Sequence, residues 1–148
     1  MLKQRGEQMK DTAQQLFKVW SSGAIADAAP LITDDFLLCD HALNRRHQGL
    51  EAVIGFFAET DDIIGLDFEL INIFVDEQVE LVAGRWVLTA TILKSGASVL
   101  APGMSMLRFR ENMVCEQNDH YSATDVIRLL FKSHPLRAFS MAKRDLFS

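Results

Sequence analysis

The sequence predicts an α+β domain in which helices pack on one face of a strongly bent, antiparallel sheet. Helical patterns fill most of residues 7–60, whereas three long stretches and one shorter stretch rich in β-branched and aromatic residues follow Gly65. Short turns join these stretches, which is typical of antiparallel hairpins. Helices gathered before strands are typical of α+β domains. We expect the hollow between helices and sheet to be the ligand site.

The expected helices are defined by apolar residues at helical spacing. The first, at residues 7–20, places Met9, Ala13, Leu16, Phe17 and Trp20 on one face, and Ser21-Ser22-Gly23 ends it. A second long helix opens at Gly49 and ends near Thr60. Shorter helical segments are expected at residues 25–31, 126–131 and 136–146.

The expected strands form a meander. They span Leu66–Val75, Val79–Leu93, Ser98–Arg110 and Met113–Tyr121, and a short extended run, Phe36–Cys39, precedes them. The connecting turns are two or three residues long, so neighbouring strands should pair with one another.

Composition limits the classes of function. The chain of 148 residues is expected to form one domain, 1–148, and its net charge of −5 argues against nucleic-acid binding. Residues 132–148 form a basic helical extension, with Lys132, Arg137, Lys143 and Arg144 against Asp145. Its net charge is therefore +3, which leaves a net charge of −8 on residues 1–131.

The N-terminus lacks the apolar core of a signal peptide and no apolar run could span a bilayer, so we expect a cytoplasmic protein.

Residues 33–57, TDDFLLCDHALNRRHQGLEAVIGFF, carry a resemblance to a known family. An acidic turn, a short strand ending in Asp40, a loop, and then a glycine and a helix resemble the SnoaL-like and ketosteroid-isomerase-like branch of the nuclear-transport-factor-2-like superfamily. The order of elements agrees over roughly residues 7–131. The resemblance implies a cystatin-like, cone-shaped half-barrel with N-terminal helices in the concave face of the sheet.

The resemblance also implies roles for individual residues. Asp40 stands where the isomerases have their general base. Leu16 occupies the place of their oxyanion-binding tyrosine, and their late-strand acid falls near Met104 or Ser105. A missing oxyanion donor typically costs about a hundredfold to a thousandfold in rate. We therefore predict no steroid isomerase activity.

The SnoaL-like cyclases place a functional acid near the end of the last strand. This chain offers Asp119 and His120 there as catalytic candidates, with Tyr121 as a further polar partner, while Ser122 replaces the acid that commonly follows. Neighbouring strand residues alternate faces, so His120 should face away from both Asp119 and Tyr121. A surface or satisfied histidine is the alternative.

Asp40 is the main catalytic candidate. It ends the apolar run FLLCD, and a carboxylate over an apolar cup would be desolvated, which raises its pKa and makes it a better base. The alternative is a carboxylate that caps the following loop through Asn44 or lies in water.

Several side chains are candidates for contact with an apolar ligand, although the same residues suit an ordinary core. They are Leu16, Trp20, Leu38, Phe57, Trp86, Met104, Ser105 and Tyr121. No metal site is expected, because the spacing of His41 and His47 fits no familiar ligand geometry. No Gly-rich phosphate loop or dinucleotide fingerprint occurs, so no cofactor is expected.

Two functions of different classes are consistent with these sequence features. The first is a small-molecule protein with Asp40 as base and an apolar carbonyl compound as substrate; the second is a noncatalytic binding or interaction module of the same fold.

A homodimer is implied by the resemblance. Residues 136–147 form a basic amphipathic segment that either covers the cup, packs in a dimer or contacts an anionic membrane; we favour the first two.

Overall fold

The computed structural model describes the backbone of residues 2–147 and the side chains of residues 4–143. Its elements, in chain order, are α1 (Leu2–Ser22), the 3-10 helix η1 (Ile25–Leu31), β1 (Ile32–Asp40), β2 (Arg45–Gln48), α2 (Leu50–Ala58), β3 (Ile64–Asp76), β4 (Leu81–Ile92), β5 (Ser98–Arg110), β6 (Met113–Tyr121), α3 (Thr124–Ser133) and α4 (Pro135–Phe147).

The strands form one curved, open sheet in the order β2-β1-β6-β5-β4-β3. The antiparallel pairs β3–β4, β4–β5 and β5–β6 confirm the predicted meander. β1 pairs antiparallel with β2 but parallel with β6, so the sheet is mixed. The predicted α+β half-barrel is thus confirmed.

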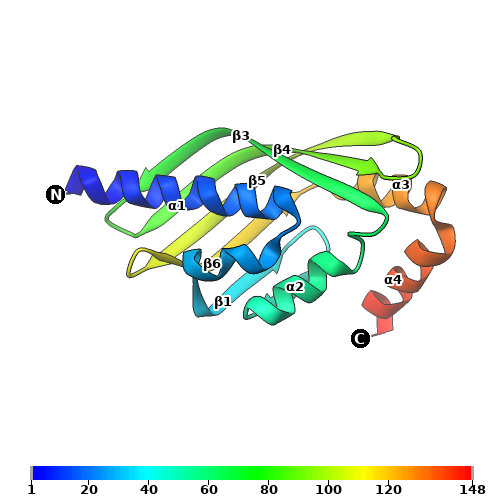
Figure 1. Cartoon of the computed structure of the whole chain (residues 1–148), viewed down its shortest axis with the longest axis horizontal. Coiled ribbons are helices and arrows are strands. Elements are labelled where there is room, and N and C mark those ends of the chain that lie inside the picture. The colour runs from blue at the N-terminus through cyan, green and yellow to red at the C-terminus, as the bar shows by residue number, and fades with distance from the viewer. Residues whose placement is uncertain (1, 148) are drawn as a thin grey trace.

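The concave face of the sheet holds the core, and α1 runs along it (Figure 1). The predicted apolar face of α1 is buried: Met9, Ala13, Leu16, Phe17 and Trp20 are all at most 3% exposed. The strands present alternate residues to this helix, as the pleat requires. On β5, for example, Ser105 and Leu107 are buried whereas Met104 and Met106 are exposed on the convex face.

The structure differs from the expected elements most clearly at β1, β2 and β4. β1 begins at Ile32 and includes residues 33–35, where the sequence indicated an acidic turn. β2 was not predicted, because RRHQ is short and polar; it forms by pairing with the outer edge of β1. β4 begins at Leu81 rather than Val79, because the carboxylate of Asp76 accepts the N–H groups of Gln78 and Val79 and holds the turn.

The two C-terminal helices lie at one end of the sheet, and α4 folds back toward α2 (Figure 1). His134 closes α3 with its N–H bonded to the carbonyl of Leu130, and Pro135 then begins α4. Proline suits the first turn of a helix because its missing N–H would have no partner there. Within the described residues, no helix is long and apolar enough to cross a membrane.

Candidate functional site

A pocket of about 230 Å³ lies where the end of the cup meets α3 and α4. Its walls are mostly apolar and come from many parts of the chain: the β1–β2 loop and β2, the end of α2, the start of β3, β4, the end of β6, α3 and α4. The apolar lining comprises Leu43, Phe56, Phe57, Ile64, Leu66, Leu88, Ala123, Val126, Ile127, Leu130, Phe131, Ala138, Met141 and Ala142. We call it the Tyr121 pocket, after its most central polar group.

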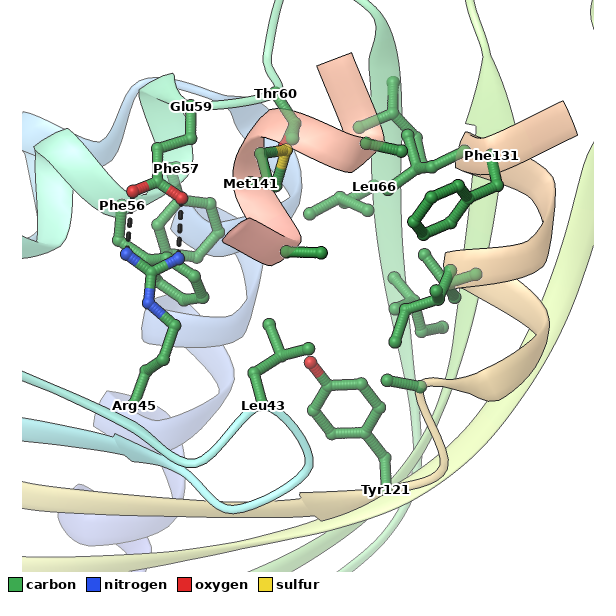
Figure 2. Close-up of a pocket in the computed structure, with 18 residues that line it drawn as sticks. Leu43, Arg45, Phe56, Phe57, Glu59, Thr60, Leu66, Tyr121, Phe131 and Met141 are labelled. Carbon is green, nitrogen blue, oxygen red and sulfur yellow. Dashed lines mark hydrogen bonds and ion pairs between the residues drawn. The ribbon is translucent and has the colours of Figure 1, made fainter. Parts of the chain in front are cut away.

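Tyr121 reaches into this pocket from the end of β6 (Figure 2). Its hydroxyl donates a 2.7 Å hydrogen bond to Oδ2 of Asp40, which is only 4% exposed. Burial and the nearby Asp40 carboxylate raise the pKa of the Tyr121 hydroxyl far above its usual value, so the phenol stays neutral.

Asp40 does not itself line the pocket. Besides the Tyr121 hydroxyl on Oδ2, its Oδ1 accepts the N–H of Leu43 at 2.9 Å. The carboxylate therefore caps the β1–β2 loop, as the alternative to catalysis expected, but through Leu43 rather than Asn44. In this arrangement a ligand would contact Asp40 through Tyr121.

The parallel pairing of β1 with β6 brings two acids together. Asp40 and Asp119 are partners in register, so their side chains leave adjacent strands on one face. Oδ1 of Asp119 accepts hydrogen bonds from Ser105 Oγ at 2.5 Å and from Gln117 Nε2 at 2.9 Å. Side chains from β1, β5 and β6 thus form one polar cluster beneath the pocket.

Two tryptophans extend this cluster into the core. Nε1 of Trp86 donates to Ser105 Oγ at 2.8 Å, and Nε1 of Trp20 donates to Gln117 Oε1 at 3.1 Å. Ser105 and Gln117 are at most 2% exposed, and such buried polar groups need these partners.

Asp119 is an acid whose surroundings raise its pKa. Its pKa is raised from 3.8 to about 6, mainly by desolvation and in part by the adjacent Asp40, while the hydrogen bonds from Ser105 and Gln117 act in the opposite direction. A carboxyl group of this kind can change its charge near neutral pH, which is the property of an acid–base catalyst.

Gly103 allows the aromatic side chains beside Tyr121 to pack closely. Trp86, Gly103 and Tyr121 are register partners across three strands, and the Trp86 and Tyr121 rings lie 5.7 Å apart. A Cβ atom at position 103 would lie 2.7 Å from Cζ2 of Trp86. The Trp86 ring can occupy its place only because this residue has no side chain.

An ion pair that the sequence analysis missed forms another wall of the pocket. Arg45 on β2 bonds both carboxylate oxygens of Glu59, just after α2, at 2.7 Å each, and its guanidinium lies over the Phe56 ring (Figure 2). No sequence signal could have paired these residues, because β2 was not predicted. Thr60 is the remaining polar residue among the described lining.

α4 covers the pocket through Ala138, Met141 and Ala142, which agrees with the alternative in which the C-terminal helix closes the cup. Arg137 secures this position by binding the carboxylate of Asp62 and the carbonyl oxygen of Glu59, both at 2.9 Å. The opposite side of α4 presents Leu136 and Phe139 to solvent.

The structure places the predicted ligand-contacting residues in several regions. Phe57 and Tyr121 line the Tyr121 pocket, and Trp20 lines a second cavity between α1 and α2. Leu16, Leu38, Trp86 and Ser105 lie in the core beneath the pocket. Met104 lies on the convex face beside its register partner His120.

His120 faces away from the pocket, as strand alternation predicts. It is exposed, and its ring stacks on that of His41 at 4.3 Å. The two residues therefore belong to the outer surface. Among the described residues, no group of three potential ligands could hold a metal ion.

The open α+β cup is the architecture of the ketosteroid-isomerase-like fold. A family model for the SnoaL-like domain matches residues 13–117, which is more than half of the chain. The chain belongs to this family. No sequence among the curated proteins matches it.

Solved structures agree with this fold. A protein of ketosteroid-isomerase-like fold from Catenulispora acidiphila, in complex with trimethylamine, is 21% identical, covers 79% of this chain and 89% of its own, and has a TM-score of 0.69. A candidate SnoaL-like polyketide cyclase from Jannaschia is 22% identical over 82% and 90%, with a TM-score of 0.69. PrhC from Penicillium brasilianum is 18% identical over 90% and 93%, with a TM-score of 0.77.

Proposed function

We propose that this protein binds a small, largely apolar molecule with one oxygen function in the Tyr121 pocket, and that Asp40 serves as a base through Tyr121. The observation that carries this proposal is the Tyr121 hydroxyl, which projects into an apolar pocket and is bonded to a buried carboxylate. Few polar groups in an otherwise apolar pocket are the usual means of orienting a ligand.

The Tyr121–Asp40 pair provides a route for a proton. The Tyr121 oxygen takes a proton from an acidic C–H or O–H of the ligand while its own proton passes to Oδ2 of Asp40. This concerted transfer avoids a free phenolate, which the raised pKa of Tyr121 makes unfavourable. Loss of a proton beside a ligand carbonyl would leave an enolate, so the reaction class is isomerisation or cyclisation.

A specific observation also favours a noncatalytic function. Both Asp40 oxygens already accept hydrogen bonds. Apart from Tyr121, the neutral hydrogen-bond donor among the described lining side chains is Thr60. An enolate held by one hydroxyl would be weakly stabilised. The alternative function is therefore a binder of the same apolar ligands without turnover.

A thermal-shift screen tests ligand binding. Apolar ketones, polyketide-like compounds, sterols and fatty acids are compared on the wild type, Tyr121→Phe and Asp40→Asn. A buried hydrogen bond contributes about 1–3 kcal/mol, so Tyr121→Phe should weaken binding about 5-fold to 100-fold. Ser122→Ala removes the neighbouring exposed hydroxyl and should change nothing.

Turnover then separates the two functions. A bound ligand that the wild type converts, and that Asp40→Asn binds without converting, supports the base. A ligand that both proteins bind equally and neither converts supports the noncatalytic function. The same assay on a Δ5-3-ketosteroid should detect no isomerisation, and any rate above that of Asp40→Asn would overturn that expectation.

A homodimer is part of the proposal, with the convex face of the sheet as its interface and a second copy as the partner. This face exposes apolar side chains next to both acidic and basic ones, which suits the self-complementary contact of a two-fold dimer. The exposed residues are Asp67, Glu69, Phe74, Arg85, Leu100, Met104, Met106 and Arg108. Light scattering after chromatography should show a dimer, and Met106→Glu should shift it to a monomer.

A further inference from the structure

We infer that the ligand of the Tyr121 pocket is an elongated, chain-like molecule whose tail enters a second cavity. This inference rests on the proposed function and adds the shape of the ligand. The second cavity, of about 440 Å³, lies between the C-terminal end of α1, η1, α2 and the start of β3. We call it the α1–α2 cavity.

The two cavities share a wall. Phe57, Thr60, Ile64 and Leu66 line both the Tyr121 pocket and the α1–α2 cavity. Because each of these residues contacts both spaces, the wall between them is one side chain thick. No charged group belongs to it, so an alkyl chain could pass without desolvating an ion.

The backbone of this wall is held in place, which leaves its side chains as the movable parts. The N–H groups of Ile63 and Ile64 bond the carbonyl oxygen of Thr60 at 3.0 and 2.9 Å. Phe57 and Leu66 are only partly buried, so either side chain can rotate by giving up part of its packing, which for Phe57 includes a stacked contact with Trp20. A rotamer change is much faster and less costly than movement of a helix.

The sizes of the two cavities favour a chain over a compact ligand. An engineered cavity of roughly 150 Å³ holds benzene, so about 230 Å³ accommodates little more than a ring or a short chain beside Tyr121. A longer molecule must extend elsewhere, and the larger apolar space lies directly behind Phe57.

The outer end of the α1–α2 cavity is open and more polar. Ser22 and Asp61 line it, and a Cβ atom placed on Gly23 would have no atom within 4 Å. A solvated or polar far end of the ligand would be tolerated there. The ligand class is therefore a medium-chain alkyl carbonyl compound, with its carbonyl group at Tyr121 and its tail in the α1–α2 cavity.

A chain-length series tests this inference. Straight-chain 2-alkanones from butanone to tetradecanone are titrated against the wild type and Ala58→Phe. Ala58 is an exposed α2 residue that lines only the α1–α2 cavity, so a phenylalanine there should fill this cavity. Ala52→Phe, at an exposed position of the same helix that lines neither cavity, is the matched control.

We expect affinity to rise about threefold to fourfold with each methylene in the wild type and Ala52→Phe, including chains too long for the Tyr121 pocket. In Ala58→Phe the rise should stop at short chains, whose affinity stays unchanged. A plateau at one chain length in all three proteins overturns the inference but leaves the proposed function intact. Failure of every alkanone to bind, or binding that Tyr121→Phe does not weaken, overturns both.

Discussion

The hydroxyl of Tyr121 donates its hydrogen bond to Oδ2 of Asp40 across 81 positions of sequence. The contact exists because β1 and β6 run parallel and side by side, so that the carboxyl ends of both strands reach the same edge of the cup. Asp40 in turn fixes the β1–β2 loop through Leu43, another residue of the pocket wall. Any change at Asp40 or Tyr121 should therefore affect the other.

A double-mutant cycle measures this dependence. Tyr121→Phe removes the donor, and Asp40→Asn leaves one acceptor oxygen for the two donors Leu43 and Tyr121, so each change should lower the free energy of unfolding by about 1–3 kcal/mol. Their effects should fall short of additivity by at least about 1 kcal/mol in urea unfolding. Tyr121→Phe combined with Asp11→Asn, at an exposed position of α1, should be additive. Additivity in both pairs would show that the hydrogen bond contributes nothing.

The pKa of Asp119 predicts a dependence of stability on pH. Because the folded-state pKa is raised from 3.8 to about 6, the folded protein binds this proton more tightly than the unfolded chain does. The resulting stabilisation is fully present below about pH 3.8 and is lost as the pH rises through 6. Its size is at most about 3 kcal/mol, from about two pKa units.

Asp119→Asn isolates this contribution. Relative to this variant, the wild type should lose stability between pH 4 and pH 7 in chemical unfolding, whereas the exposed α1 variant Asp11→Asn should follow the wild-type profile. Asp40→Asn removes a neighbouring negative charge and should lower the pKa of Asp119, which carboxyl-carbon NMR would detect. An upward shift of that pKa, or parallel profiles for wild type and Asp119→Asn, would contradict this electrostatic account.

Gly103→Ala should disturb the site through packing alone. The added Cβ would press on the Trp86 ring, and overpacking of this kind typically costs about 1–3 kcal/mol. Because Trp86 packs against Tyr121, ligand binding should weaken as well. Gly55→Ala is the control: this α2 glycine has nothing within 4 Å of an added Cβ, so the protein should be unchanged or slightly more stable.

The fold could be predicted because its signals are local. The apolar face of α1 and the meander from β3 to β6 follow from periodicity and short turns, and both were confirmed. The strand β2 was missed because a short polar segment at a sheet edge carries no such periodicity. Its strand structure depends on a partner, β1, rather than on its own residues.

The candidate site was less accessible to prediction because it is made of long-range pairings. Family resemblance selected Asp40 and Asp119, and alternation correctly placed His120 on the other face. The pairing of Arg45 with Glu59 depends on where β2 and α2 meet, which no spacing in the sequence encodes. The contribution of α3 and α4 to the pocket likewise follows only from how these helices fold back.

The exposed side of α4 tests the membrane alternative for residues 136–147. Ala138, Met141 and Ala142 already cover the pocket, which leaves Leu136 and Phe139 as the outward apolar side chains among those that the structure describes on α4. Two such residues bury little surface in a bilayer, so we expect no co-sedimentation with vesicles containing phosphatidylserine. Binding that is lost on removing residues 135–148 or in Leu136→Ser/Phe139→Ser would reverse this conclusion.

Arg137 should control how firmly α4 covers the Tyr121 pocket. Its ion pair with Asp62 is exposed, so Arg137→Met should change global stability by less than about 1 kcal/mol. The same change also removes the hydrogen bond from Arg137 to the carbonyl oxygen of Glu59, a second polar contact between α4 and the region after α2. Local opening of α4 should therefore become more frequent while the core stays folded.

Hydrogen exchange measures this opening directly. In Arg137→Met, amides of residues 138–143 should exchange several times faster, while those of β4 and β5 keep their wild-type rates. Arg128→Met, which breaks the exposed pair between Arg128 and Asp125 on α3, should leave α4 unchanged. Ligand association and dissociation should both accelerate in Arg137→Met if α4 is the route of entry. Unaltered ligand kinetics together with faster exchange would instead place the entry at the open end of the α1–α2 cavity.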